Sequence, residues 1–198
     1  MPDRIEQAKR ALRADLRERR QTVSAHAREA AEAGVTEQLD ALVARLGARS
    51  ISCFLSTPTE PGTHAFVRGA VGRGIRVLLP ITREDGLLDW SVATADTEIT
   101  EGLFGLPEPV GDVLGPIAVN DVDLLIIPAA AVDHQGMRLG WGRGYFDKTL
   151  GSMEKCPPVY AVIFDSELID DVPRDVHDQP VTGVVTPTRT LPLAAPTS

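Results

Sequence analysis

Cysteine is scarce in this sequence of 198 residues, which contains only Cys53 and Cys156. Neither cysteine has a CxxC or Cys/His spacing, so a disulfide framework or a thiolate metal site is not expected. Cys53 lies in the apolar run 51–55, which is typical of a buried strand, and Cys156 precedes two prolines in a predicted loop. We therefore predict two free thiols in a reducing compartment.

Long apolar segments and an excess of positive charge are also missing. No uninterrupted apolar run approaches the ~20 residues of a membrane span, and the N-terminal residues include acids and lack the apolar core of a signal peptide. The formal net charge is -8, which disfavours nucleic acids and anionic membranes as partners, because both are bound by concentrated Lys and Arg. We expect a cytoplasmic protein, in which a local basic pocket for a small phosphate ligand remains possible.

Hydrophobic residues make up 43% of the chain, enough to fill one sizeable core. We therefore expect a single domain over residues 1–198. Apolar residues recur at spacings of three and four over 3–22 and again towards residue 46, and Gly47 is a suitable helix end. These patterns predict a helical N-terminal part over residues 1–47. The tail over 191–198 is expected to be frayed.

From residue 51 onwards the hydrophobic pattern changes to short apolar runs separated by turn residues. Strands are predicted over residues 51–55, 75–79, 87–92, 123–127, 159–164 and 181–186, and helices over 63–73 and 144–150. Pro80 is expected to end the second strand, and two Gly and two Pro predict a loop over 102–109. Strands alternating with helices predict an α/β fold with a mainly parallel sheet between helices.

The first helix carries a row of basic residues. Arg10, Arg13, Arg17 and Arg20 recur at spacings of three and four, so they share one side of the helix. For most of these arginines the charge pattern favours a solvated helix face. Lys9 and Arg13 are four residues apart and point to one side of the helix.

The segment 128–147 is the most informative part of the chain. It follows the apolar run 123–127 and leads into the predicted helix 144–150, and in open α/β sheets ligands bind at the carboxyl ends of strands. Its glycines allow a phosphate to approach backbone N–H groups, while its arginines suit phosphate oxygens and its acid suits Mg²⁺. These residues are Gly136, Gly140, Gly142 and Gly144, with Arg138, Arg143 and Asp147. The spacing matches neither a P-loop nor a dinucleotide fingerprint.

The run 136–147, Gly-Met-Arg-Leu-Gly-Trp-Gly-Arg-Gly-Tyr-Phe-Asp, resembles the signature of the 5-formyltetrahydrofolate cyclo-ligase family, also called methenyltetrahydrofolate synthetases. The order of the other elements is similar over nearly the whole chain. These elements are the run from Lys9 to Arg13, the loop ending at Glu60, the Gly/Pro loop over 102–109, and His177-Asp178. The central run is specific, whereas the other matches are weak when taken alone.

The resemblance implies a three-layer α/β/α fold related to the sugar-phosphate isomerase and CoA-transferase group. It also implies a ligase that forms a C–N bond, converting 5-formyltetrahydrofolate into 5,10-methenyltetrahydrofolate with ATP and Mg²⁺ and releasing ADP and phosphate. The partners would be a reduced folate and ATP, and we expect a monomer. In the implied chemistry the formyl oxygen accepts the γ-phosphoryl group, N10 attacks the activated carbon, and loss of phosphate completes the ring.

The resemblance also assigns roles to individual residues. ATP would be bound by Lys9, Arg10, Arg13, Gly136, Arg138, Leu139, Gly140, Trp141, Gly142, Arg143, Gly144, Tyr145 and Phe146. The catalytic residues would be Arg138, Arg143 and Tyr145. The folate would contact Leu55, Glu60 and Tyr145. Magnesium would be held by Asp147 and Asp178.

The chain departs from the family pattern at two positions of the signature. Tyr145-Phe146 stands where the family usually has two tyrosines, and Arg143 stands where it usually has lysine. Two alternatives to the folate cyclo-ligase remain open. One is an ATP-dependent enzyme on the same scaffold that acts on another small anionic substrate, and the other is a non-catalytic regulator that binds a nucleotide or a folate.

Overall fold

The computed structural model of the chain describes residues 2–193. The chain begins with two long helices, α1 (Pro2–Gln21) and α2 (Ala25–Leu46). Ser24 caps α2, because its hydroxyl accepts a hydrogen bond from the Ala27 N–H at 3.2 Å. Gly47 ends α2 in the left-handed conformation, which a glycine adopts without steric cost. The predicted helical part over residues 1–47 therefore agrees with the described residues.

A seven-stranded sheet forms the centre of the molecule, with the order β12-β11-β9-β6-β1-β2-β3. The strands are β1 (Ser50–Cys53), β2 (Arg76–Thr82), β3 (Leu88–Val92), β6 (Leu124–Pro128), β9 (Val159–Val162), β11 (Gly183–Val185) and β12 (Thr190–Pro192). The five inner strands are mutually parallel, and only the edge strands β3 and β12 run antiparallel to their neighbours. The predicted α/β fold with a mainly parallel sheet is confirmed.

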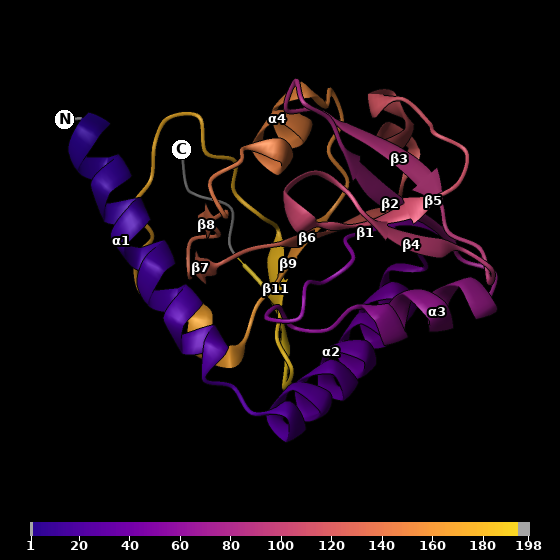
Figure 1. Cartoon of the computed structure of the whole chain (residues 1–198), viewed down its shortest axis with the longest axis horizontal. Coiled ribbons are helices and arrows are strands. Elements are labelled where there is room, and N and C mark those ends of the chain that lie inside the picture. The colour runs from indigo at the N-terminus through magenta and orange to yellow at the C-terminus, as the bar shows by residue number, and fades with distance from the viewer. Residues whose placement is uncertain (1, 194–198) are drawn as a thin grey trace.

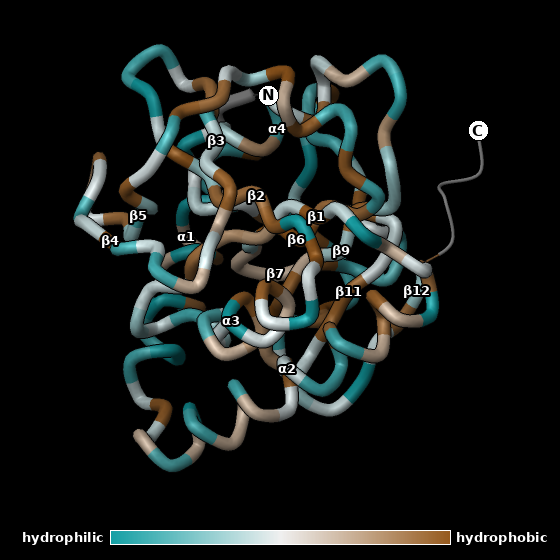
Figure 2. The backbone as a smooth tube through the Cα atoms, turned by 90° about the vertical axis from the view of Figure 1, so that its right-hand side faces the viewer, coloured by the Kyte–Doolittle hydropathy of each residue, from teal (hydrophilic) through white to brown (hydrophobic). Residues whose placement is uncertain are grey.

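Helices cover both faces of this sheet (Figure 1). α2 and α3 (His64–Gly72) lie on one face, while α4 (Tyr145–Ser152) and the 3-10 helix η2 (Pro116–Asp121) pack on the other. Successive residues of β6 alternate between the two cores: Leu124 and Ile126 pack under α2 and α3, and Leu125 and Ile127 under α4. In Figure 2 the hydrophobic colour accordingly follows the central strands. The predicted three-layer arrangement is confirmed.

α1 lies outside these layers, beside β7 (Ala131–Asp133) and β8 (Arg138–Leu139) (Figure 1). These two strands form a small sheet with β10 (Leu168–Ile169), which follows the 3-10 helix η3 (Asp165–Glu167). A third cluster of apolar side chains, including Leu16 of α1 and Leu139 of β8, joins α1 to this sheet. The basic side of α1 is thereby brought close to the glycine-rich segment that follows β8.

Three details of the predicted secondary structure are wrong. The predicted loop over 102–109 contains the 3-10 helix η1 (Leu103–Gly105) and part of β5 (Pro107–Val110), which pairs with β4 (Glu98–Glu101) in a two-stranded ribbon, where prolines are tolerated. Pro80 does not end β2, because β1 pairs with β2 only as far as Leu78 and needs no donor from Pro80.

The third correction concerns the C-terminal residues. Leu191 and Pro192 are not frayed but belong to β12, which pairs with β11. Residues 194–198 of the predicted frayed tail lie outside the described residues. None of the helices within residues 2–193 is both long enough and apolar enough to cross a membrane.

Candidate functional site

The sheet has a topological switch point at β1. The chain passes from β1 to β2 on one side and later returns to place β6 on the other side. The loops that leave two such neighbouring strands diverge, and the crevice between them is the usual ligand site of an open α/β sheet. A cavity of about 380 Å³ lies here, lined by Phe54 and Leu55 after β1 and by Pro128 at the end of β6.

The cavity wall is rich in charged side chains. Six of them are basic, namely Lys9, Arg13, Arg17, Arg20, Arg138 and Arg143, and four are acidic, namely Glu60, Glu108, Asp147 and Asp178. The cavity therefore carries an excess of positive charge although the whole chain has a formal net charge of -8. Such a local reversal of sign favours an anionic ligand over other small molecules.

The glycine-rich segment supplies one wall of the cavity between β8 and α4. Gly142 and Gly144 have φ angles of +94° and +72°, which other residues rarely adopt. A side chain at Gly142 would also lie 3.4 Å from the Arg13 guanidinium. The two glycines therefore give the segment a path that turns tightly and lets α1 approach the backbone closely.

α1 holds this segment through its basic residues. Arg13 Nε donates a 2.7 Å hydrogen bond to the Gly140 carbonyl, and the guanidinium carbons of Arg17 and Arg20 lie 5.5 Å and 4.9 Å from the centre of the Trp141 ring. The predicted solvated face is therefore wrong for Arg20, which is only 2% exposed. Arg10, the fourth member of the row, is exposed and does not line the cavity.

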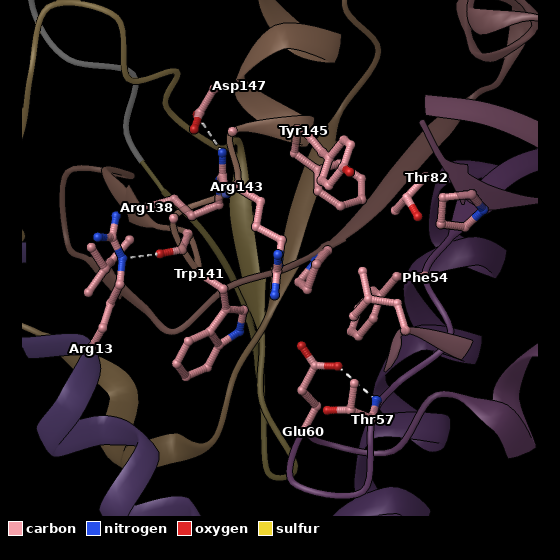
Figure 3. Close-up of a pocket in the computed structure, with 18 of the residues that line it drawn as sticks. Arg13, Phe54, Thr57, Glu60, Thr82, Arg138, Trp141, Arg143, Tyr145 and Asp147 are labelled. Atoms are coloured by element: carbon pink, nitrogen blue, oxygen red, sulfur yellow. Dashed lines mark hydrogen bonds and ion pairs between the residues drawn. The ribbon is translucent and has the colours of Figure 1, made fainter. Parts of the chain in front are cut away.

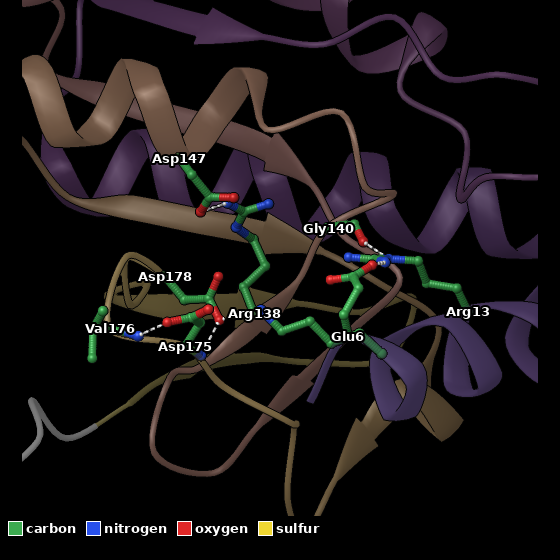
Figure 4. A network of polar contacts seen from close by, with 9 residues as sticks. Glu6, Arg13, Arg138, Gly140, Asp147, Asp175, Val176 and Asp178 are labelled. Carbon is green, nitrogen blue, oxygen red and sulfur yellow. Dashed lines mark hydrogen bonds and ion pairs between the residues drawn. The ribbon is translucent and has the colours of Figure 1, made fainter. Parts of the chain in front are cut away.

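Two ion pairs lie at the basic end of the cavity, where Figure 4 shows Asp147 and Asp178 on two sides of Arg138. Arg138 Nη2 lies 2.5 Å from Asp147 Oδ1, and Lys9 Nζ lies 2.6 Å from Asp178 Oδ2. Burial lowers the pKa of Arg138, and the carboxylates of Asp147 and Asp178 partly offset this effect. Its Nε is buried without a hydrogen-bond partner among the described residues. Arg138 is thus a poorly solvated cation that an anionic ligand would stabilise.

The two carboxylates fit a magnesium ion that is completed by substrate and water. Mg²⁺ typically takes one or two carboxylates together with phosphate oxygens and water molecules. Within residues 2–193 no group of three or more His, Cys, Asp and Glu side chains is suitably placed to hold a metal. Asp147 and Asp178 both lie at the cavity wall near Arg138, so they provide the donor set expected for a phosphate-bound Mg²⁺.

The opposite end of the cavity is formed by Glu60, Trp141 and apolar side chains (Figure 3). Glu60 Oε2 accepts a 2.8 Å hydrogen bond from the Thr57 N–H, which fixes the carboxylate within its own loop. Burial raises the pKa of Glu60, while the Thr57 hydrogen bond and the charge of Arg20 counteract this rise. A carboxylate in an apolar wall suits a flat ligand that presents N–H donors.

Tyr145 and Arg143 lie between these two ends. The Tyr145 hydroxyl donates a 3.0 Å hydrogen bond to the Arg83 carbonyl, and the tyrosine is 8% exposed. The Arg143 guanidinium carbon lies 3.5 Å from the centre of the Phe104 ring. Phe104 belongs to η1 and has a positive φ of 62°, which is rare for a bulky residue. Arg143 therefore connects the glycine-rich segment to the ribbon formed by β4 and β5.

The cavity brings together most of the residues singled out in the sequence. It is lined by Lys9, Arg13, Leu55, Glu60, Arg138, Leu139, Gly140, Trp141, Gly142, Arg143, Gly144, Tyr145, Phe146, Asp147 and Asp178. Arg10 and Gly136 lie outside it. Gly136 occupies the turn between β7 and β8, where its N–H binds the Asp133 carbonyl at 3.0 Å and its carbonyl accepts from Val181 at 2.8 Å. Its place in the glycine-rich run thus has a structural explanation.

Several lining residues were not found from the sequence. Arg17 and Arg20 share the helix side of Arg13, so the spacing of the basic row was a usable signal. Glu108 binds the N–H and the hydroxyl of Thr82, and both residues line the cavity. No local pattern marks Glu108 or Thr82, because only the pairing of distant strands brings them together.

The comparison with known proteins agrees with the geometry. A family model described as the 5-formyltetrahydrofolate cyclo-ligase family matches residues 5–187. The chain belongs to this family. A 5-formyltetrahydrofolate cyclo-ligase of Mycolicibacterium smegmatis is 33% identical over 92% of this chain and 95% of its own length. The family predicted from the glycine-rich run is therefore confirmed.

Solved structures of family members have the same fold. The NMR structure of 5,10-methenyltetrahydrofolate synthetase from Aquifex aeolicus superposes with a TM-score of 0.79 at 25% identity, covering 96% of this chain and 95% of that one. A 5,10-methenyltetrahydrofolate synthetase from Mycoplasma pneumoniae gives a TM-score of 0.71 at 18% identity, covering 90% and 98%. These superpositions support the α/β/α architecture described above.

Proposed function

We propose that this chain is a ligase that cyclises 5-formyltetrahydrofolate to 5,10-methenyltetrahydrofolate, with ATP converted to ADP and phosphate. The observation that carries the proposal is the cavity at the switch point, which has a basic end and an apolar end that holds the Glu60 carboxylate. Membership of the cyclo-ligase family supports the reaction. The cavity supports the pairing of a nucleotide triphosphate with a flat heterocycle.

The basic end is suited to the ATP phosphates. Lys9, Arg13 and Arg138 line it, Arg143 lies between it and the other end, and the glycines at 140, 142 and 144 leave the backbone open to close approach. In phosphoryl transfer most of the catalytic effect comes from positioning and from neutralising charge on the transferring group. We assign Arg138 and Arg143 to that role, because a guanidinium group can donate hydrogen bonds to the γ-phosphoryl oxygens and neutralise their charge.

The other end is suited to the reduced folate. The Glu60 carboxylate accepts hydrogen bonds, and the pterin ring presents adjacent N–H donors at its edge. Leu55 and Tyr145 supply apolar surface beside it, and Trp141 lies next to the Glu60 carboxylate. This arrangement directs the formyl group of the folate towards Arg138 and Arg143.

The proposed reaction consists of two bond exchanges. The formyl oxygen attacks the γ-phosphorus, the bond to ADP breaks, and the N5 lone pair stabilises the activated carbon as an iminium. N10 then forms the new C–N bond, loses its proton and expels phosphate. The protein holds the two substrates in line, balances the developing negative charge with its arginines, and limits access of water to the activated carbon.

We assign Asp147 and Asp178 to magnesium. A bound Mg²⁺ would neutralise charge on the ATP phosphates. Before it binds, both carboxylates are paired with Arg138 and Lys9 respectively. With Asp147 and Asp178 holding the ion, Arg138 and Lys9 would be free to pair with the phosphates. We also propose that the protein acts in the cytoplasm as a monomer, which light scattering of the purified chain would test.

The reaction is tested by mixing the purified protein with 5-formyltetrahydrofolate, ATP and Mg²⁺ and following the near-ultraviolet absorbance of methenyltetrahydrofolate. We expect the signal to grow only when both ATP and Mg²⁺ are present, with one ADP formed for each product molecule. A flat trace from a protein that binds ATP would refute the proposed reaction. Product formation without Mg²⁺ would refute the metal assignment alone.

A further inference from the structure

Arg20 is a buried cation in the cavity wall that the reaction described above does not use. Its Nε and Nη2 each lie 2.7 Å from a carboxylate oxygen of Glu167, and Nη2 also donates to the Ala129 carbonyl at 2.9 Å. Its Nη1 is buried and has no partner among the described residues. Three hydrogen bonds therefore fix the plane of the guanidinium without any contribution from a substrate.

The fixed guanidinium lies against Trp141. The distance from its central carbon to the centre of the indole ring is 4.9 Å, and Phe164 lies at 5.5 Å from the same carbon. Arg17 reaches the Trp141 ring as well, at 5.5 Å. Cation–π contacts of this kind favour one orientation of the ring over the cation. Trp141 sits between two glycines and packs against the apolar cluster of α1 and β8, so these contacts with cations add to what fixes its ring.

Trp141 in turn lies beside Glu60 (Figure 3). The charge of Arg20 also acts on the Glu60 carboxylate and lowers its pKa, against the rise that burial causes. Arg20 is thus connected to Glu60 in two ways, directly through its charge and indirectly through the indole. Glu60 itself lines the cavity at its apolar end.

Stability alone does not account for the Arg20–Glu167 pair. Apolar residues of similar volume commonly replace a buried ion pair without loss of stability, because desolvation offsets the attraction between the charges. The two side chains are 2% and 4% exposed, so the desolvation cost applies to both. A cation at this position has a use that an apolar side chain lacks, namely its attraction to the indole and to Glu60.

We propose that Arg20 is a positioning residue for the folate end of the site. Held by Glu167, it fixes the Trp141 ring and, through that ring, the carboxylate of Glu60 that accepts the pterin N–H donors. The inference rests on the proposed function for the identity of the ligand. The geometry of Arg20, Trp141 and Glu60 can be tested without it.

The test uses a double variant, Arg20→Met with Glu167→Gln. The glutamine can still accept the 2.8 Å hydrogen bond that the Phe164 N–H donates to Glu167, and no unpaired carboxylate is left buried. The matched control is Arg73→Met, which breaks the exposed Arg73–Asp40 pair away from the cavity. Arg20→Lys is the conservative variant, because lysine keeps the charge but loses the planar fork.

Two measurements report on the proposal. The first is acrylamide quenching of tryptophan emission, which observes Trp141 selectively because Trp90 is 1% exposed and shielded. The second is the KM for 5-formyltetrahydrofolate compared with the KM for ATP. For the double variant we expect faster quenching and a rise of about tenfold in the folate KM, with the ATP KM changed less than about twofold. Arg20→Lys should show the same two changes to a smaller extent than the double variant.

Unchanged quenching and an unchanged folate KM in the double variant, equal to those of Arg73→Met, would overturn the proposal. A lower melting temperature with both readouts unchanged would also overturn it, since Arg20 would then be only structural. If the double variant does not fold, the quenching and the folate KM of Arg20→Lys test the proposal instead, and values equal to those of Arg73→Met would overturn it. A wild-type protein without cyclo-ligase activity would refute the proposed function instead, and the quenching result would still decide the position of Trp141.

Discussion

Replacement of Glu60 by glutamine tests the folate end of the cavity most directly. The amide oxygen of the new side chain can still accept the 2.8 Å hydrogen bond from the Thr57 N–H, so the loop keeps its shape. The change removes the charge and places an N–H group where the pterin donors are expected. A hydrogen bond to a charged group contributes about 1.5–3 kcal/mol, which corresponds to a rise of roughly 10- to 150-fold in the folate KM.

The pH dependence of this variant follows from the pKa of Glu60. Burial raises that pKa above its usual value of 4.5, and in the proposed binding mode the carboxylate is the form that accepts the pterin donors. Folate affinity of the wild type should therefore fall as the pH decreases through the raised pKa. The Glu60→Gln variant has no such titration, so its folate KM should lack this acid limb.

The free energy of unfolding should depend on pH in the opposite sense to the folate affinity. A carboxyl whose pKa is raised in the folded state binds more protons when folded, so its contribution to the free energy of unfolding falls as pH rises from 4.5 through the raised pKa. At neutral pH the partly buried charge is a cost that glutamine does not carry. We expect the Tm of Glu60→Gln at pH 7 to be higher than that of the wild type.

The assay is the initial rate of methenyltetrahydrofolate formation at varied folate and at varied ATP, with an ATP-free blank at every pH. Glu98→Gln is the control, because Glu98 lies exposed on β4. The ATP KM should stay within about twofold of the wild type, since we assign the phosphates to the other end of the cavity. An unchanged folate KM in Glu60→Gln, or an equal rise in both KM values, would show that Glu60 does not contact the folate.

Two further predictions concern the metal and the backbone. Asp147→Asn should lower kcat by at least about a hundredfold and raise the Mg²⁺ concentration needed for half activity, while its circular dichroism spectrum stays unchanged. The control Asp171→Asn, at an exposed position, should leave both values unchanged. Equal Mg²⁺ titrations for the two variants would refute the metal assignment. Gly136→Ala should lower the urea midpoint more than Gly47→Ala, because both positions have positive φ but only Gly136 would place a Cβ 2.7 Å from the Val181 carbonyl. Equal midpoints would show that the turn relaxes freely.

The main elements of the fold could be predicted from the sequence. Buried parallel strands are short apolar runs, and the run 123–127 is recognisable because both faces of β6 are covered. The ribbon of β4 and β5 could not be predicted, since its prolines and glycines are typical of loops and its pairing is non-local. The same holds for β12, whose register with β11 depends on the position of that neighbour.

The candidate site was predicted in part for a similar reason. The glycine-rich run carries its chemistry within a dozen residues, so Arg138, Arg143 and Asp147 could be named directly. Arg20 was assigned to a solvated face, because a helical pattern shows which residues share a side but not what that side faces. Its partner Glu167 lies 147 positions away along the chain, and Trp141 is similarly distant in sequence.

The sequence by itself determined most of the strands of the central sheet and the main helices, the family, and the place of the glycine-rich loop to which we assign phosphate binding. Each of these depends on neighbouring residues, through periodicity, backbone freedom at glycine or a contiguous motif. Only the tertiary structure decided that α1 closes the cavity, that Glu108 meets Thr82, and that Arg20 and Trp141 adjoin Glu60. These contacts depend on packing between distant segments, because burial and charge pairing are fixed only when the layers and the small sheet have come together.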